Sequence, residues 1–179
     1  AIFFEAEGVK ADKSDMNCFS LSDGADQFEI ACVFDDLPES LVLDENVTTS
    51  LAQEFLLNAE GSLEVVKSFK ATTGRPDRTA IRCQHPADKV LSSLLGQKIA
   101  DLKKLGEERG VAGFVADKRV ASLWRQAIRQ TAVPIELTEC LLDVDKGLSA
   151  ETKSIWGRIQ DRLPTFALFN ADRESSDGA

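Results

Sequence analysis

Charged side chains that could do chemistry cluster near the end of the chain, directly after a short apolar run. Residues 163–169 read Leu-Pro-Thr-Phe-Ala-Leu-Phe, and Asp172 and Arg173 follow closely. A buried strand of this kind can deliver charged groups to a sheet edge, where α/β proteins keep their sites. The alternative is a last core strand followed by a frayed tail. We take Asp172 and Arg173 as candidate site residues.

A second acidic group, Asp35, Asp36 and Glu39, lies at the end of another expected strand. Such carboxylates could hold the divalent ion of a metal-dependent nuclease. However, adjacent residues of a strand point to opposite faces, which separates Asp35 from Asp36. We therefore prefer a solvated strand end and expect no metal site.

Basic residues form one stripe, on a helix that we expect at residues 116–131. Lys118, Arg125 and Arg129 are separated by seven and four residues, which places them opposite the apolar face. This stripe is the candidate contact with a DNA backbone, because lysine and arginine neutralise phosphates. The alternative is an ordinary solvated helix face.

Several catalytic arrangements are missing. The chain has one histidine, so a Ser-His-Asp or Cys-His site would have to use His85, which precedes Pro86 at an expected helix start. For His85, helix capping or solvent exposure is the alternative reading. Neither a Gly-x-x-x-x-Gly-Lys-Ser/Thr loop nor a Gly-x-Gly-x-x-Gly motif occurs. We assign no catalytic residue to this chain.

Composition narrows the class of protein. The 179 residues are 43% hydrophobic with a net charge of -9, which allows a real core and argues against a nucleic-acid binder that uses its whole surface. No apolar run approaches the roughly 20 residues of a membrane span, and no signal peptide is visible. We expect no membrane partner. The four cysteines form no Cys-x-x-Cys pair, so we expect reduced, mostly buried thiols in a cytoplasmic protein.

The elements that must position these residues begin with strands. Residues 27–35 alternate, with Phe28 to Phe34 apolar at every second position, which predicts an antiparallel strand with one solvated face. Residues 54–57 and 63–70 flank Gly61 and predict a hairpin. Residues 79–84 predict a further strand.

Helical spacing follows. Apolar residues from Val90 to Leu105 predict a helix with Pro86 in its first turn. Gly106 and Gly110 are expected to end it. Residues 116–131 predict a second helix, and residues 133–144 an edge strand or loop. Ser149 can cap a third helix that buries Ile155, Trp156 and Ile159 and ends at Leu163. Strands followed by helices and a closing strand predict an α+β (mixed α/β) fold.

The order of several motifs resembles large ATP-binding proteins of the AAA, SMC/RecF-like and OLD-like families, which include ATP-dependent nucleases. Residues 34–39 read Phe-Asp-Asp-Leu-Pro-Glu, and residues 56–61 read Leu-Leu-Asn-Ala-Glu-Gly. The most specific match is residues 163–177, which resemble the family's Leu-Pro-x-x-Ala-Leu-Phe-x-x-Asp-Arg-x-x-Ser-Asp. The resemblance implies a phosphate loop before Ala1, and signature and acidic motifs after Ala179, so we expect a fragment of a longer chain.

The resemblance also implies partners and a division of the chain. The parent protein would bind ATP and Mg²⁺, pair two heads as a homodimer, and act on DNA in metabolism, repair or phage defence. Asp172 and Arg173 would lie near the nucleotide or a head-to-head contact, and the isolated fragment would carry no cofactor. We divide the chain into a β-rich part (1–84), a helical insertion (85–162) and a closing strand with a polar loop (163–179). The alternative function is an acidic protein-interaction module without nucleotide chemistry.

Overall fold

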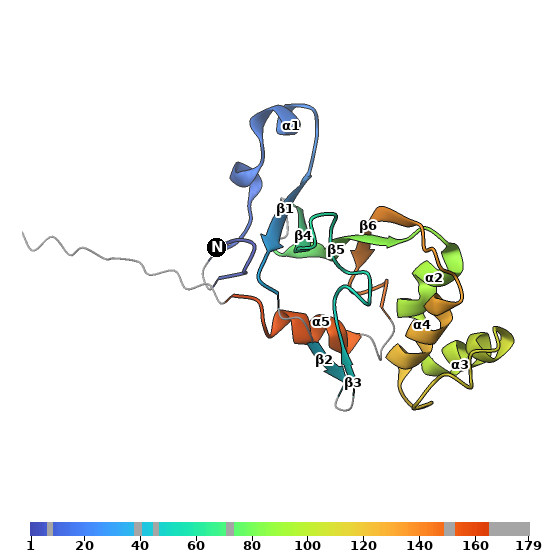
Figure 1. The fold of residues 1–179 in the computed structure, drawn as a ribbon. Helices are drawn as coiled ribbons and strands as arrows, with labels where there is room; N and C mark the ends of the chain where they lie inside the picture. The colour runs from blue at the N-terminus through green and yellow to red at the C-terminus, as the bar shows by residue number, and fades with distance from the viewer. Residues whose placement is uncertain (7–8, 38–40, 45–46, 71–73, 149–152, 165–179) are drawn as a thin grey trace, which may run out of the picture.

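A four-stranded antiparallel sheet is the centre of the computed structural model, which describes residues 1–6, 9–37, 41–44, 47–70, 74–148 and 153–164. The strands lie in the order β1-β4-β5-β6 (Figure 1). They are β1 (Gln27–Phe34), β4 (Leu63–Lys70), β5 (Pro76–Pro86) and β6 (Leu137–Asp143). Helices are segregated from these strands, so the α+β fold class is confirmed.

The edge strand β1 follows its sequence pattern. Phe28, Ile30, Cys32 and Phe34 are half-buried, whereas the residues between them are exposed. Each β1 residue is paired with one in β4, from Gln27 opposite Lys70 to Phe34 opposite Leu63. The predicted antiparallel strand with one solvated face is therefore confirmed.

The solvated face of the sheet carries charges across neighbouring strands. Arg82 on β5 lies between Glu64 on β4, at 2.8 Å, and Glu139 on β6, at 3.6 Å. Arg78 likewise pairs with Asp143 at 3.2 Å. Opposite charges placed side by side on antiparallel strands favour this register.

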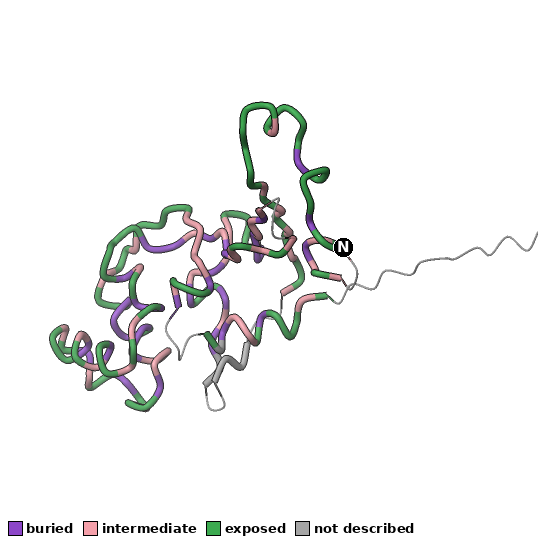
Figure 2. The backbone as a smooth tube through the Cα atoms, turned by 180° about the vertical axis from the view of Figure 1, so that it is seen from behind, coloured by how far each residue is buried: buried purple, intermediate pink, exposed green. Residues whose placement is uncertain are grey.

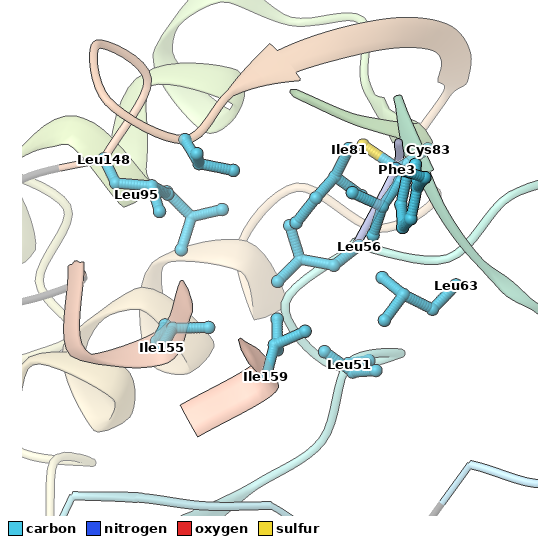
Figure 3. Packing of buried hydrophobic residues seen from close by; sticks show 12 residues of the cluster. Phe3, Leu51, Leu56, Leu63, Ile81, Cys83, Leu95, Leu148, Ile155 and Ile159 are labelled. Carbon is cyan, nitrogen blue, oxygen red and sulfur yellow. The ribbon is translucent and has the colours of Figure 1, made fainter. Parts of the chain in front are cut away.

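The other face of the sheet holds the larger hydrophobic core. Helix α5 (Lys153–Gln160) covers it, with Ile155 and Ile159 directed toward the sheet (Figure 3). The buried members are Phe3, Leu51, Leu56, Leu63, Val65, Ile81, Cys83, Leu95, Val144, Leu148, Ile155 and Ile159. The short ribbon of β2 (Leu41–Asp44) and β3 (Val47–Thr49) lies beside α5 (Figure 1).

A helical unit, defined here as residues 87–136, leaves the sheet from β5 and returns to it as β6, the neighbouring strand. It contains α2 (Lys89–Ser93), the 3-10 turn η2 (Leu94–Gly96), α3 (Ile99–Glu108) and α4 (Ala121–Gln130). It has a core of its own around Leu102, Trp124 and Ile128. In this structure β6 and α5, both inside the predicted insertion 85–162, belong to the sheet and its core.

The long helix expected after Pro86 is wrong in detail. Pro86 ends β5, and Asp88 caps α2 instead by accepting hydrogen bonds from two backbone amides at 2.9 Å. The predicted helix is divided into α2, η2 and α3. Gly106 does not end α3 but lies inside it, where the Trp124 ring leaves no room for a Cβ. Gly110, with φ of +70°, lies just past its end as expected.

The predicted hairpin is also wrong. Residues 51–55 form turns rather than a strand, and β4 pairs with β1 and β5. The predicted strand at 79–84 is correct but longer, and 133–144 contains the edge strand β6. The N-terminal part, with a 3-10 turn (Lys13–Asp15) and α1 (Cys18–Ser22), forms a mostly exposed excursion (Figure 2). Ser149 and residues 165–179 of the predicted closing strand and loop lie outside the described residues.

Candidate functional site

An apolar pocket of about 150 Å³ lies where β1 ends. It is lined by residues 34–37, by Leu51 and Leu63, and by residues 159 and 162–164. Two segments that are more than a hundred positions apart therefore meet here. They are the first parts of the Asp-Leu-Pro-Glu motif and of the Leu-Pro motif described above.

A tight turn from the third motif supports the same pocket. The Asn58 side chain accepts hydrogen bonds from the backbone amides of Glu60, at 3.1 Å, and Ser62, at 2.9 Å. Gly61 has φ of +82°, a conformation that favours glycine. The turn holds the buried Ser62 so that its hydroxyl donates to Asp35 at 2.5 Å.

The pocket has a mostly apolar lining with charged side chains at its rim. Asp35, Asp36 and Arg162 are all exposed there. Asp36 has φ of +51°, an uncommon conformation for a non-glycine residue. Within the described part of the chain, no three metal-ligating side chains gather. Glu39, the third member of the acidic group, lies outside the described residues.

The predicted basic face of α4 is wrong. Arg125 binds Glu54 through two hydrogen bonds of 2.7 and 3.0 Å, and Arg129 binds the same carboxylate at 2.9 Å. The side chains of Arg125, Arg129 and Glu54 are only 3%, 7% and 2% exposed. Lys118 is exposed, but it lies before α4 begins. In this structure the two arginine side chains are buried, so they are not accessible to a DNA backbone.

The prediction of an exposed basic face fails because both sides of α4 are covered. The helical unit buries the apolar side of α4, and the segment with the turn at residues 51–55 buries the opposite side. Arg129 also donates to the backbone oxygen of Gln53 at 2.8 Å, and its guanidinium lies 5.1 Å from the centre of the Phe55 ring. A polar face on a helix wheel can thus be an internal face when another segment supplies the opposite charge.

The electrostatic balance of this ion triad, defined as Glu54, Arg125 and Arg129, is unequal. Burial opposes ionisation of Glu54, but hydrogen bonds and charge from the two arginines outweigh it and lower the pKa of the carboxyl. Burial lowers the pKa of Arg129, although Glu54 opposes that effect. Arg125 Nη1 and Arg129 Nε and Nη2 have no hydrogen-bond acceptor among the described residues. Two positive charges share one negative charge, so the triad depends strongly on Glu54.

Sequence reasoning missed Glu54. A signal was present, because Glu54 directly precedes the apolar Phe-Leu-Leu of residues 55–57, where an unpaired acid is costly to bury. Its partners lie 71 and 75 positions later in the sequence. No local pattern links residues so far apart.

His85 is a structural crosslink in this fold. It is buried, which differs from the expected capping or exposed position. Its ring nitrogens lie 3.0 Å from the Phe55 carbonyl oxygen and 3.1 Å from that of Ser92. Because both nitrogens face backbone oxygens, neither is directed at a nucleophilic serine or cysteine side chain.

The remaining predicted residues, Asp172 and Arg173, lie outside the described part of the chain. Within that part, no helix combines the length and the apolar character needed to cross a bilayer. Comparisons with protein-family models, with curated proteins and with solved structures gave no significant match.

Proposed function

We propose that this chain forms the interior of the ATP-binding head of an SMC/RecF/OLD-like ATPase. The observation that carries the proposal is that two motif segments line one pocket and the turn that follows the third motif contacts one of them. Residues 34–37 and Leu163 and Pro164 line it, and the turn at residues 58–62 holds Asp35 beside it. The resemblance to the family gains support when the fold brings the matching segments together, because chance matches scattered along the chain would not be expected to meet.

The position of the helical unit supports the same proposal. It connects two neighbouring antiparallel strands, so it adds to the sheet without changing strand order. The families that this chain resembles carry a variable insertion at the corresponding point in the motif order. The short helices α2, α3 and α4 would be a compact form of that insertion.

ATP hydrolysis would require the complete ATP-binding head of the longer protein. ATP and Mg²⁺ would bind to a phosphate loop that precedes Ala1 in the longer protein, and phosphoryl transfer depends on positioning and on stabilising charge. This chain would supply the antiparallel layer and, through Asp172 and Arg173, groups near the nucleotide or the second head. Arginine suits this role because its forked donors match phosphate oxygens. DNA would contact other parts of the homodimeric parent.

The first test is the natural reading frame around this chain. We expect a Gly-x-x-x-x-Gly-Lys-Ser/Thr motif about 10–20 residues before Ala1, which is roughly the length of one helix. A start codon at or just before Ala1 would overturn the proposal.

The second test is kinetic and uses the longer protein. Arg173→Ala should lower ATP turnover while leaving the unfolding temperature nearly unchanged. Arg158→Ala is the matched control, because Arg158 is exposed on α5. Equal turnover in wild type, Arg173→Ala and Arg158→Ala would remove Arg173 from the site.

A protein-interaction module is the second candidate function. It is favoured by two large apolar side chains on the surface, Phe19, which is 76% exposed, and Phe114, which is 81% exposed. Exposed aromatic residues can anchor protein contacts. This function requires a natural gene product with ends near Ala1 and Ala179, so the same reading frame distinguishes the two candidates.

A further inference from the structure

Two cysteine side chains meet across neighbouring strands of the sheet. Cys83 on β5 is the register partner of Cys140 on β6, and their sulfur atoms lie 3.9 Å apart. Both thiols are free. A disulfide brings sulfur atoms to about 2.05 Å, so bond formation needs a closure of about 2 Å, which is within reach of side-chain rotation on paired strands.

We propose that Cys83 and Cys140 are a reversible oxidation site, in which Cys140 reacts first with a low-molecular-weight disulfide and Cys83 then completes a cross-strand disulfide. The order follows from exposure. Cys140 is half-buried on the edge strand β6, whereas Cys83 is fully buried on β5. A reagent in solution therefore meets the sulfur of Cys140 before that of Cys83.

Electrostatics support the same order. The hydrogen bond shared with Cys83 lowers the pKa of the Cys140 thiol to about 7, and this effect exceeds the opposing effects of burial and of Glu139. The same pairing, together with burial, raises the pKa of Cys83. Thiolates are the nucleophiles in disulfide exchange, so the lowered pKa of Cys140 favours this residue as the attacking thiol.

The reaction balances without a further oxidant. The Cys140 thiolate attacks one sulfur of the external disulfide, forming a mixed disulfide and releasing one small thiolate. That thiolate accepts the proton of Cys83, whose sulfur then attacks Cys140 and expels the second small thiolate. Two protein thiols are oxidised, and one external disulfide is reduced to two thiols.

The bond would have a defined effect on the fold. β5 leads into the helical unit and β6 returns from it, so the disulfide closes a loop that contains the whole unit. The oxidised protein should therefore resist separation of β6 from β5. The reduced protein keeps only the strand hydrogen bonds at this position.

The other two cysteines provide internal controls. Cys18 is exposed, and it lies on α1, far in sequence from the pair. Burial raises the pKa of Cys32, which makes it a poor nucleophile at neutral pH. Neither Cys18→Ser nor Cys32→Ser should prevent oxidation of the pair.

The test incubates the full chain with defined ratios of reduced and oxidised glutathione, followed by acid quenching and peptide mass spectrometry. Wild type should form the Cys83–Cys140 disulfide and lose it again in excess reduced glutathione. Cys83→Ser should stop at a glutathione adduct on Cys140, whereas Cys140→Ser should leave Cys83 unmodified. Circular dichroism identifies any variant that fails to fold, and the wild-type result stands independently of both variants.

Two results would overturn the proposal. One is a wild-type chain that shows no Cys83–Cys140 bond even in oxidised glutathione. The other is a glutathione adduct that forms on Cys83 before it forms on Cys140. Hydrogen exchange then tests the effect on the fold, because β6 amides should exchange more slowly after oxidation, and equal rates would remove that effect.

Discussion

Arg125 on α4 holds Glu54 in a two-point ion pair across 71 positions of sequence, and both side chains are almost completely buried. Arg129 joins the same carboxylate from one helical turn further along. This ion triad links the helical unit to the turn that precedes β4. The helical unit is therefore held by a buried ionic contact in addition to its two strand connections.

Glu54→Gln should destabilise the protein strongly. The substitution keeps the shape of the side chain but leaves two buried guanidinium groups without a counter-charge. Loss of one partner from a buried ion pair costs about 3–5 kcal/mol. Urea unfolding followed by circular dichroism measures the loss. Glu139→Gln is the control, because Glu139 is 62% exposed and pairs with Arg82 at 3.6 Å, so its loss should cost less than about 1 kcal/mol. Equal losses in the two variants would show that burial of the triad is unimportant.

Acid should weaken the triad. The pKa of Glu54 is lowered in the folded protein, so its contribution to stability is fully present above the ordinary pKa of a glutamate, about 4.3. That contribution is lost as pH falls through the lower, folded value. The free energy of unfolding should fall between about pH 5 and pH 2 more steeply in wild type than in Glu54→Gln. Other acids, such as Asp117 with a pKa of about 2, remain in both proteins, so parallel curves would contradict this assignment.

Gly106→Ala should destabilise the helical unit. A Cβ at this position would lie 2.5 Å from two carbon atoms of the Trp124 ring. That ring is buried and is held by a hydrogen bond from its nitrogen to the Lys118 carbonyl oxygen at 3.1 Å. Overpacking costs about 1–3 kcal/mol, whereas alanine gains about 1 kcal/mol over glycine inside a helix. The cost of the clash should exceed the helix-propensity gain. The variant should therefore unfold at lower urea concentration than wild type, as followed by tryptophan fluorescence.

Gly113→Ala is the matched substitution for Gly106→Ala. Gly113 lies in the same helical unit, and a Cβ there would meet nothing within 4 Å. Its effect on the unfolding midpoint should be small. If Gly106→Ala were as stable as Gly113→Ala, the packing of α3 against α4 would be looser than the structure shows.

Ser62→Ala should loosen the pocket wall at the end of β1. The buried Ser62 hydroxyl donates to Asp35 at 2.5 Å, and we expect a loss of about 1 kcal/mol from removing it. Ser68→Ala removes a similar bond, to Glu29 at 2.9 Å on the exposed side of the sheet, and should cost close to nothing. Chemical denaturation of the two variants side by side would reveal whether the Asp35 contact contributes.

Local patterns predicted the parts of this fold that local physics controls. Alternation identified β1 and its solvated face, because every second residue of an edge strand faces water. Helical spacing identified α4 and its buried members Trp124 and Ile128. Composition and element order were enough for the α+β class, because β1 to β5 follow one another in the chain and most helices come after them.

Tertiary contacts decided the rest. Helix spacing assigned Arg125 and Arg129 to the surface, since nothing near them in sequence offers a buried counter-charge. Gly106 was expected to end a helix because glycine commonly does so, whereas here its missing Cβ makes space for Trp124. The apolar run at residues 54–57 predicts a strand, whereas here its side chains are buried or half-buried without strand pairing.

The adjacency of β5 and β6 makes the helical unit an exchangeable cassette. Because its two ends lie on paired strands, a longer or shorter module could be grafted there without moving the sheet. The grafted module would have to keep two contacts with the rest of the protein. It must place an apolar side chain where Leu95 packs in the core beneath the sheet. It must also either present a cation to Glu54 or leave that carboxylate exposed to water.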